Sequence, residues 1–309
     1  MSIVEQALKK LRQAEVAPEL ERFRRTVPMG VIRETRDATP SQQPGKELAA
    51  SRRVVCLDRD ALLHAGFLPP ESQQRRIADQ FRHIKRPLVA KALGQGTVTS
   101  ANGRRIMVAG SMPGEGKTFT AVNLAFNMSL ERDVTILLVD ADVAKPHISR
   151  MFGLAAEPGL LDALRDESLD PESLVLPTDV PGLSVLPAGK QVDNATELLS
   201  SDRMRQVVER LDQSRGTSRI ALFDSPPLLL TNESRALAQV MGQVVLVVKA
   251  SDTPQQAVFD ALDLLGDQVS VGLVLNQSDS PDGAGYYHYR GGAYGSYGAY
   301  GDSGSDSAA

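Results

Sequence analysis

The stretch Ile106–Ala125, IMVAGSMPGEGKTFTAVNLA, decides the fold. Four apolar residues come first, a glycine-rich turn follows, and a segment of helical composition closes the stretch. Glycines let successive backbone N–H groups wrap around a phosphate, and the N-terminus of a following helix adds positive potential. The order strand, glycine-rich loop and helix therefore predicts a phosphate-binding P-loop. A glycine-rich turn that binds no nucleotide is the alternative, and the triplet Gly116–Thr118 at the junction argues against it.

Each part of this loop has an expected role. Lys117 would reach the terminal phosphates of a nucleotide, and the Thr118 hydroxyl would bind Mg²⁺. The usual pattern has glycine five residues before the Gly–Lys pair, where this chain has Ser111. We predict nucleotide contacts from the loop and the first helical turn: Ser111, Met112, Pro113, Gly114, Glu115, Gly116, Lys117, Thr118 and Phe119.

Two further apolar segments end in carboxylates. One runs into Asp140, with Asp142 two residues later, and the other runs into Asp224. The carboxyl ends of parallel strands face the same crevice, so these groups are expected beside the P-loop. Mg²⁺ with its waters needs such oxygens. We assign Thr118, Asp140 and Asp224 to the metal; the alternative for Asp142 is a helix N-cap.

The rest of residues 97–280 alternates short apolar runs with helical stretches. Continuous apolar strands separated by helices are typical of a parallel sheet covered on both faces. The sequence therefore predicts an α/β fold with a doubly wound, mostly parallel sheet. The expected strands are Ile106–Ala109, Val134–Val139, Leu183–Leu186, Ile220–Phe223, Val244–Val248 and Val271–Leu275.

The N-terminal part is an extension of this domain. Residues 1–25 contain apolar residues at helical spacing and predict an amphipathic helix, either solvated or docking on a partner or membrane surface. Residues 26–50 have the composition of a flexible linker. Within 51–96 we expect a short strand at Arg53–Leu57 and a longer helix at residues 71–93, where apolar side chains step by three or four.

Composition narrows the class of protein. A net charge of −4 argues against a general nucleic-acid-binding surface. Cys56 is the one cysteine, so no intramolecular disulfide can form, and a reducing cytoplasmic compartment is expected. The N-terminus lacks the apolar segment of a signal peptide, and no run of 18 apolar residues occurs. Membrane association is therefore expected only through a partner or a surface helix.

The six tyrosines of the chain all lie near its C-terminus, within residues 281–309. Tyrosine is useful in cores and interfaces, so its confinement to a Gly- and Ser-rich segment is informative. One explanation is a low-complexity tail for weak contacts. The other is a phosphoacceptor cluster: Tyr286, Tyr287, Tyr289, Tyr294, Tyr297 and Tyr300.

Together these motifs resemble the bacterial tyrosine kinases (BY-kinases) of capsule and exopolysaccharide synthesis, P-loop relatives of the MinD and ParA ATPases. Their Walker A motif is matched by Ser111–Thr118, Walker A′ by Leu138–Pro146, and Walker B by Phe223–Pro227. The subgroup linked to exosortase clusters is the most similar. The oligomerisation motif Glu-x-x-Arg-x-x-Arg is matched only in part, by Asp79, Arg82 and Lys85.

The resemblance implies an ATP- and Mg²⁺-dependent tyrosine autokinase that phosphorylates its tail in trans within a ring. Lys117 would stabilise the transferred phosphoryl group, and Asp140 or Asp142 would orient and deprotonate the tyrosine hydroxyl, whose free pKa is near 10. Asn276 holds the position where relatives contact adenine. Implied partners are a membrane-embedded activator of the chain-length-determinant type, further copies of the chain and a tyrosine phosphatase.

Some residues depart from the family pattern. Lys85 keeps the charge of an arginine but loses its bidentate fork, the Walker A′ arginine pair is reduced to Ala144–Lys145, and Asn232 stands where the family often has Asp. Met112 replaces the additional lysine of the MinD and ParA ATPases, which argues against a positioning ATPase. That class, and a non-catalytic assembly factor of polysaccharide export, are the alternative functions.

Overall fold

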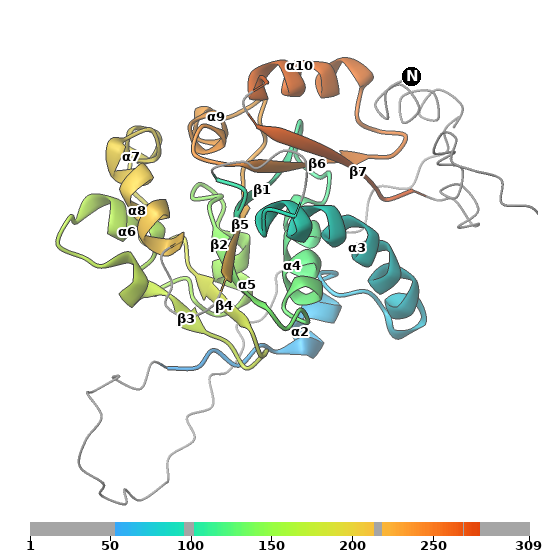
Figure 1. The fold of residues 1–309 in the computed structure, drawn as a ribbon, viewed down its shortest axis with the longest axis horizontal. Coiled ribbons are helices and arrows are strands. Elements are labelled where there is room, and N and C mark those ends of the chain that lie inside the picture. The colour runs from blue at the N-terminus through green and yellow to red at the C-terminus, as the bar shows by residue number, and fades with distance from the viewer. Residues whose placement is uncertain (1–52, 96–101, 213–217, 268, 279–309) are drawn as a thin grey trace, which may run out of the picture. The chain divides into compact units, whose positions relative to one another are not determined.

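The structure is a computed structural model, and it describes residues 53–95, 102–212, 218–267 and 269–278. Figure 1 shows a central sheet with helices around it. The strands are β1 (Arg105–Gly110), β2 (Val134–Asp140), β3 (Leu176–Pro177), β4 (Leu183–Leu186), β5 (Ser218–Asp224), β6 (Gln243–Lys249) and β7 (Ser270–Asn276). The helices are α2 (Arg59–His64), α3 (Glu71–Ala92), α4 (Lys117–Met128), α5 (His147–Met151), α6 (Leu160–Arg165), the 3₁₀ turn η1 (Pro171–Leu174), α7 (Ala195–Leu199), α8 (Asp202–Asp212), α9 (Asn232–Ala238) and α10 (Gln255–Leu265).

The sheet has the order β3-β4-β2-β5-β1-β6-β7. Every neighbouring pair is parallel except β3 and β4. The strand β1 therefore lies inside the sheet, between β5 and β6, and the loop that leaves it opens at the sheet's interior. The strands β2 to β5 lie on one side of β1, and β6 and β7 lie on the other. Open α/β sheets bind ligands at such a point, where the strand order changes direction. The predicted doubly wound, mostly parallel α/β fold is confirmed.

All six predicted strands form, each within two residues of its expected ends. Strands β1, β2, β5 and β6 are buried along nearly their whole length because helices cover both faces of the sheet. Continuous apolar runs are the sequence expression of that double burial. The edge strand β7 is only partly buried, because it has a neighbouring strand on one side only.

Two features near the other edge differ from expectation. Strand β3 was not predicted; it is two residues long and pairs antiparallel with β4. The strand expected at Arg53–Leu57 is reduced to a single bridge between Val55 and Thr178. Pro177 has no N–H to donate, so this edge supports little further pairing.

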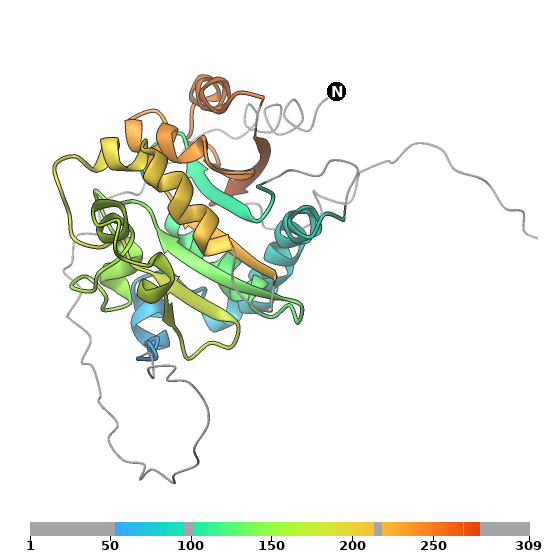
Figure 2. The same cartoon turned by 60° about the vertical axis from the view of Figure 1, so that its left-hand side comes forward.

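The two faces of the sheet carry separate cores. One core contains side chains of α2, α3, α4 and α5, and the other contains side chains of α6, α7, α8, α9 and α10. Figures 1 and 2 show α3 and α8 on opposite sides of the sheet. The predicted helix at residues 71–93 is α3, and its Phe81 ring lies 6.3 Å from the ring of Phe119 in α4. Helix α3 is thus packed on α4, the helix that follows the P-loop.

Several expectations fall outside the described residues: the amphipathic helix of residues 1–25, the linker of 26–50 and the tail of 281–309. In the part of the chain that the structure describes, no helix combines the length and apolarity needed to cross a bilayer.

Candidate active site

The P-loop joins β1 to α4 through two left-handed glycines. Gly114 has φ +81° and Gly116 has φ +89°, a region that side chains rarely adopt. A Cβ at Gly116 would lie 2.1 Å from Nδ2 of Asn276, so the close approach of β7 also requires glycine there. The loop that the sequence predicts is therefore formed, and Gly116 directly precedes the N-terminus of α4.

Lys117 lies across the loop. Its Nζ donates to the carbonyl oxygen of Met112 at 2.8 Å, and the side chain is buried. Burial lowers the pKa of Lys117, while the negative charges of Glu115, Asp224 and Asp142 raise it. These carboxylates keep a cation at the point where the P-loop would hold phosphate oxygens.

The carboxylates of Asp140 and Asp224 end adjacent strands. The two residues are paired in the register of β2 and β5, as their positions after apolar runs predict. Asp224 is 0% exposed, and within the described structure neither of its carboxylate oxygens makes a hydrogen bond of good geometry, although the Thr118 hydroxyl lies close enough to act on it. Burial and the neighbouring charge of Asp140 raise the pKa of Asp224 well above its ordinary value, and the Thr118 hydroxyl opposes this shift. A fully buried carboxylate of this kind favours a further cation beside it.

Only one of the two carboxylate oxygens of Asp140 has hydrogen-bond partners among the described residues. Its Oδ2 accepts hydrogen bonds from the backbone N–H and the hydroxyl of Ser149, both at 2.7 Å, whereas its Oδ1 is buried without a partner among the described residues. Burial raises the pKa of Asp140 to about 6, and the charge of Asp142 adds to the shift. Ser149 in turn accepts the N–H of Ala188, so the carboxylate is oriented by α5 and by the segment after β4.

Asp142 lies in a local turn. Its Oδ1 accepts the backbone N–H of Lys145 at 3.0 Å, and the N-cap of the next helix, α5, is Pro146. The alternative in which Asp142 caps a helix is therefore wrong. Burial raises the pKa of Asp142, with Lys117 among the charges that lower it. Asp142 thus belongs to the same electrostatic cluster as the P-loop.

The donor set fits Mg²⁺ bound together with a nucleotide. The partnerless buried atoms are Ser111 Oγ, Asp140 Oδ1 and both oxygens of Asp224. Within the described residues no group of three His, Cys, Asp or Glu side chains is arranged to hold a metal alone. Mg²⁺ does not require such a cage, because it is usually held by one or two carboxylates, waters and substrate phosphates. Thr118, Asp224 and Asp140 are the residues that would hold it.

Asn276 and Gln277 connect β7 to the P-loop. Asn276 Nδ2 donates to the carbonyl oxygen of Glu115 at 2.9 Å, and Gln277 Nε2 donates to that of Gly114 at 3.2 Å. The structure therefore brings Asn276 to the P-loop, and its predicted contact with adenine stays a prediction. Gln277 was missed because no local pattern identifies it.

Other predicted nucleotide-binding residues differ in how they reach the site. Met112, Pro113 and Gly114 are exposed on the loop, whereas Glu115 is almost fully buried. The Phe119 side chain is partly buried against the α3 side of the sheet. A contribution of Phe119 to nucleotide binding would therefore come from its backbone N–H.

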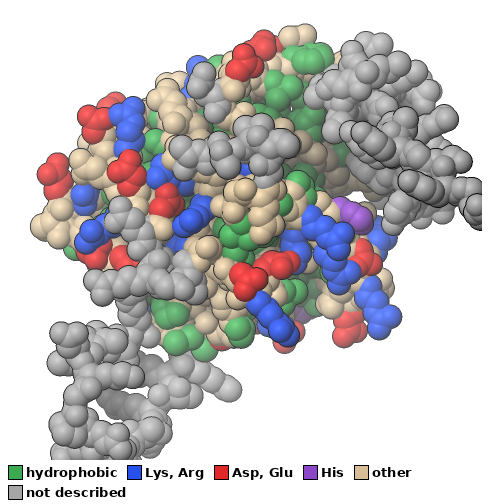
Figure 3. Space-filling view, in the orientation of Figure 1, with side chains coloured by type: hydrophobic (Ala, Val, Ile, Leu, Met, Phe, Trp, Pro, Cys, Tyr) green, Lys and Arg blue, Asp and Glu red, His purple; other side chains and the backbone are tan. Residues whose placement is uncertain are grey.

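The predicted oligomerisation residues are divided by the structure. Asp79 and Arg82 pair with each other on the exposed surface of α3. Lys85 is only 7% exposed; its Nζ donates to the carbonyl oxygen of Asn127 at 2.8 Å and pairs with Glu131 at 2.7 Å. Figure 3 shows charged side chains of both signs gathered on this part of the surface. Lys85 thus anchors α3 to the end of α4, and assembly through this motif stays a prediction.

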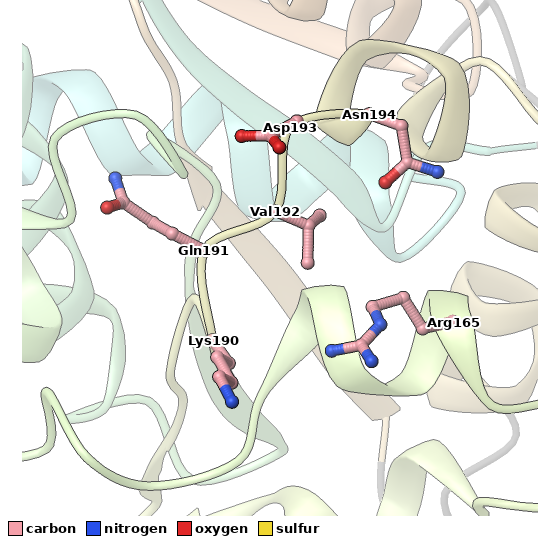
Figure 4. Close-up of a pocket in the computed structure, with 6 residues that line it drawn as sticks. All are labelled: Arg165, Lys190, Gln191, Val192, Asp193 and Asn194. Atoms are coloured by element: carbon pink, nitrogen blue, oxygen red, sulfur yellow. The ribbon is translucent and has the colours of Figure 1, made fainter.

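A separate pocket of about 490 Å³ lies beside the Walker A′ turn. Gln191 Nε2 donates to the carbonyl oxygens of Val143 and Ala144 at 3.1 and 2.9 Å, which attaches the pocket wall to this turn. In Figure 4 Val192 and Arg165 point into the pocket and Gln191 points away from it. The pocket contains none of the predicted site residues; its lining is Arg165, Lys190, Gln191, Val192, Asp193 and Asn194.

Residues 103–261 match the AAA_31 family, described as an AAA domain, and this segment is more than half of the chain. The chain belongs to this AAA domain family. The matched segment contains the P-loop, Asp140, Asp142 and Asp224 and ends within α10, before β7 and Asn276.

Known proteins similar to this AAA domain are tyrosine kinases and polysaccharide-transport proteins. Tyrosine-protein kinase ptk of Acinetobacter johnsonii is 29% identical over 183 residues, which cover 58% of this chain and 24% of that protein. Succinoglycan biosynthesis transport protein ExoP of Rhizobium meliloti is 28% identical over 238 residues, covering 72% of this chain and 29% of that protein. The crystal structure of the VpsO kinase domain is 26% identical with a TM-score of 0.55, and the match covers 68% of this chain and 100% of that domain.

The resemblance to bacterial tyrosine kinases is thereby confirmed. The chain spans less than a third of the length of the two curated relatives and the whole of the solved kinase domain.

The pKa of Asp140 predicts how the stability of the metal-free protein depends on pH. The native pKa of Asp140, about 6, lies above the ordinary value of 3.8. Between these two pH values the native state therefore holds a proton that the unfolded chain has released. Stability from this group is fully present below about pH 4 and is lost as the pH rises through about 6, a loss of about 2 kcal/mol between pH 4 and pH 8.

This dependence is measured by urea unfolding in EDTA across that range, with Asp140→Asn as the matched variant. The variant keeps a carbonyl oxygen for Ser149 and has no proton to lose. The difference in the free energy of unfolding between wild type and variant should therefore change by about 2 kcal/mol from pH 4 to pH 8. A constant difference would contradict the prediction.

Proposed function

We propose that this protein is an ATP-dependent protein-tyrosine kinase that phosphorylates the tyrosine cluster of its own C-terminal tail. The observation that carries the proposal is the pair of buried carboxylates, Asp140 and Asp224, with three partnerless oxygens beside the P-loop lysine. A loop that bound no nucleotide would not need this costly arrangement. The similarity to tyrosine kinases supplies the reaction class.

On the phosphate side, the loop amides and Lys117 stabilise the charge on the transferred γ-phosphoryl group. Bound Mg²⁺ would neutralise charge on the β- and γ-phosphates. Thr118 would supply a hydroxyl ligand and Asp224 would supply carboxylate oxygens, and both residues are held in place by the start of α4 and the end of β5.

On the acceptor side, Asp140 or Asp142 orients the tyrosine hydroxyl and accepts its proton, and Asp142 takes this role when Oδ1 of Asp140 is bound to the metal. A base is needed because free tyrosine has a pKa near 10. Ser149 holds Oδ2 of Asp140, which leaves Oδ1 for the metal or for the incoming hydroxyl. The pKa of about 6 leaves Asp140 mostly ionised near neutral pH and strong enough as a base.

The tail is long enough to serve as substrate for a neighbouring copy. Tyr286 and Tyr300 lie 10 and 24 positions after Asn276. Extended, such a segment spans up to roughly 30–80 Å. Transfer in trans within a homo-oligomer, with Asp79 and Arg82 at an exposed surface of α3, follows from the proposal.

Phosphosite mapping by mass spectrometry tests the proposal directly. After incubation with ATP and Mg²⁺, we expect phosphate on several of the six tail tyrosines of the wild-type chain. A variant truncated after residue 280 should acquire none, and when mixed with full-length Lys117→Met it should phosphorylate the tail of that inactive partner. A positioning ATPase or assembly factor would instead hydrolyse or bind ATP with no phosphotyrosine on an immunoblot.

The names of the relatives support a proposal for the cellular role. One of them is named a succinoglycan biosynthesis transport protein. We propose that tail phosphorylation regulates synthesis and export of an exopolysaccharide or capsule. We place the protein in the cytoplasm at the inner face of the membrane, held there by a chain-length-determinant-type activator. A tyrosine phosphatase would remove the phosphate from the tail.

A further inference from the structure

Glu115 is a buried acid within the P-loop. It is 1% exposed, and its Oε2 accepts the backbone N–H of Met112 at 3.0 Å. A Cβ at Gly110 would lie 2.2 Å from the same oxygen, so the absent side chain of Gly110 is the space that the carboxylate fills. The Glu115 side chain is therefore turned under the loop, and its negative charge lies against a backbone amide of the loop that would bind phosphate.

One side chain from outside the loop holds the other oxygen of this carboxylate. Thr253, in the connection between β6 and α10, donates its Oγ1–H to Glu115 Oε1 at 2.8 Å, across 138 residues of sequence. The same Oγ1 accepts the backbone N–H of Lys249 at 3.0 Å, which fixes the hydroxyl in place. Thr253 is 8% exposed, so water does not readily replace this contact.

The electrostatics make this contact consequential. Burial raises the pKa of Glu115, while the hydrogen bonds from Met112 and Thr253 and the charge of Lys117 lower it. The charged carboxylate is thus stabilised in its turned-under position by a small number of donors. Without the hydroxyl, the charged carboxylate loses a donor and turns toward solvent at the loop, where it would repel phosphate and compete for Lys117.

We propose that Thr253 is a positioning residue for nucleotide binding: its hydroxyl holds the Glu115 carboxylate beneath the P-loop and away from the phosphates. The inference rests on the proposed function only in that the P-loop binds ATP. It adds a residue that lies outside all three Walker motifs.

The experiment measures the affinity for a fluorescent ATP analogue with Mg²⁺ in the full chain. Thr253→Val removes the hydroxyl at constant shape and is expected to weaken binding about tenfold. Thr253→Ser keeps the hydroxyl and should restore most of the affinity. The matched control is Thr178→Val, which removes another buried threonine hydroxyl, bonded to the carbonyl oxygen of Leu183, at the β3 edge. Thr178→Val should lower stability and leave the affinity unchanged.

A double-mutant cycle separates positioning from general structure. In a Glu115→Gln background no charge remains to be restrained, so Thr253→Val should change the affinity by less than about threefold. An equal loss in both backgrounds, or no loss in the first, would overturn the proposal. If Thr253→Val does not fold, Thr253→Ala takes its place in the same cycle. Wild-type protein that binds ATP without forming phosphotyrosine would contradict the proposed kinase function and leave this test intact.

Discussion

Lys117→Met is expected to reduce phosphate transfer to the tail tyrosines at least about 100-fold. The lysine is the cation that the structure places on the P-loop, and its charge faces Glu115, Asp224 and Asp142. Removing one preorganised charge or donor that stabilises a transition state costs about 100- to 1,000-fold in rate. The measurement is incorporation of labelled phosphate from ATP by the purified variant.

The matched control is Lys190→Met. Lys190 is an exposed lysine whose backbone N–H, not its ammonium, bonds to Asp162. The Lys190→Met variant should phosphorylate the tail at the wild-type rate. Tail labelling by Lys117→Met at more than a tenth of the wild-type rate would show that the P-loop is not the transfer site.

Asp224→Asn is expected to have two large effects of opposite sign. It should lower the rate of tail phosphorylation about 100-fold or more, because the carboxylate next to the Thr118 hydroxyl is lost. It should also stabilise the metal-free protein at pH 8, because Asp224 is fully buried with no hydrogen-bond partner among the described residues and its pKa is raised well above 3.8. The gain should disappear when the pH is lowered and the wild-type acid is protonated.

Asp212→Asn is the contrasting control for this pair of effects. Asp212 is partly buried, whereas Asp224 is fully buried, and the Asp212 carboxylate pairs with the Arg105 guanidinium at 2.6 Å, away from the P-loop. Its replacement leaves a buried arginine poorly paired and should cost about 1–3 kcal/mol without changing the intrinsic transfer rate. Chemical denaturation in EDTA and labelling with ATP measure the two effects. A destabilised Asp224→Asn would contradict the view that the buried Asp224 carboxylate costs stability in the metal-free protein.

Much of the fold could be predicted because it depends on local patterns. The apolar runs of β1, β2, β5 and β6 are continuous since both faces of the sheet are covered, and α3 shows helical spacing over its length. The predictions of strands failed where a partner far away in the sequence decides whether a strand forms. Strand β3 exists because β4 lies beside it, and Val55 forms one bridge because Pro177 limits pairing at that edge.

The site divides in the same way. Gly116, Lys117, Asp140 and Asp224 could be predicted, since phosphate binding requires a glycine turn after a strand and metal binding requires carboxylates at strand ends. The chain of contacts that orients them could not. Ser149 is nine residues from Asp140, yet no spacing rule assigns it to that carboxylate.

By itself, the sequence determined the doubly wound sheet, the P-loop and the acids around it, because the required periodicities and glycines act over a few neighbouring residues. Only the tertiary structure decided that Lys85 binds the end of α4, that Gln191 holds the Walker A′ turn and that Thr253 restrains Glu115. Each of these contacts joins residues at least 42 positions apart. Such contacts depend on how helices pack on the sheet, and burial then makes each hydrogen bond costly to lose.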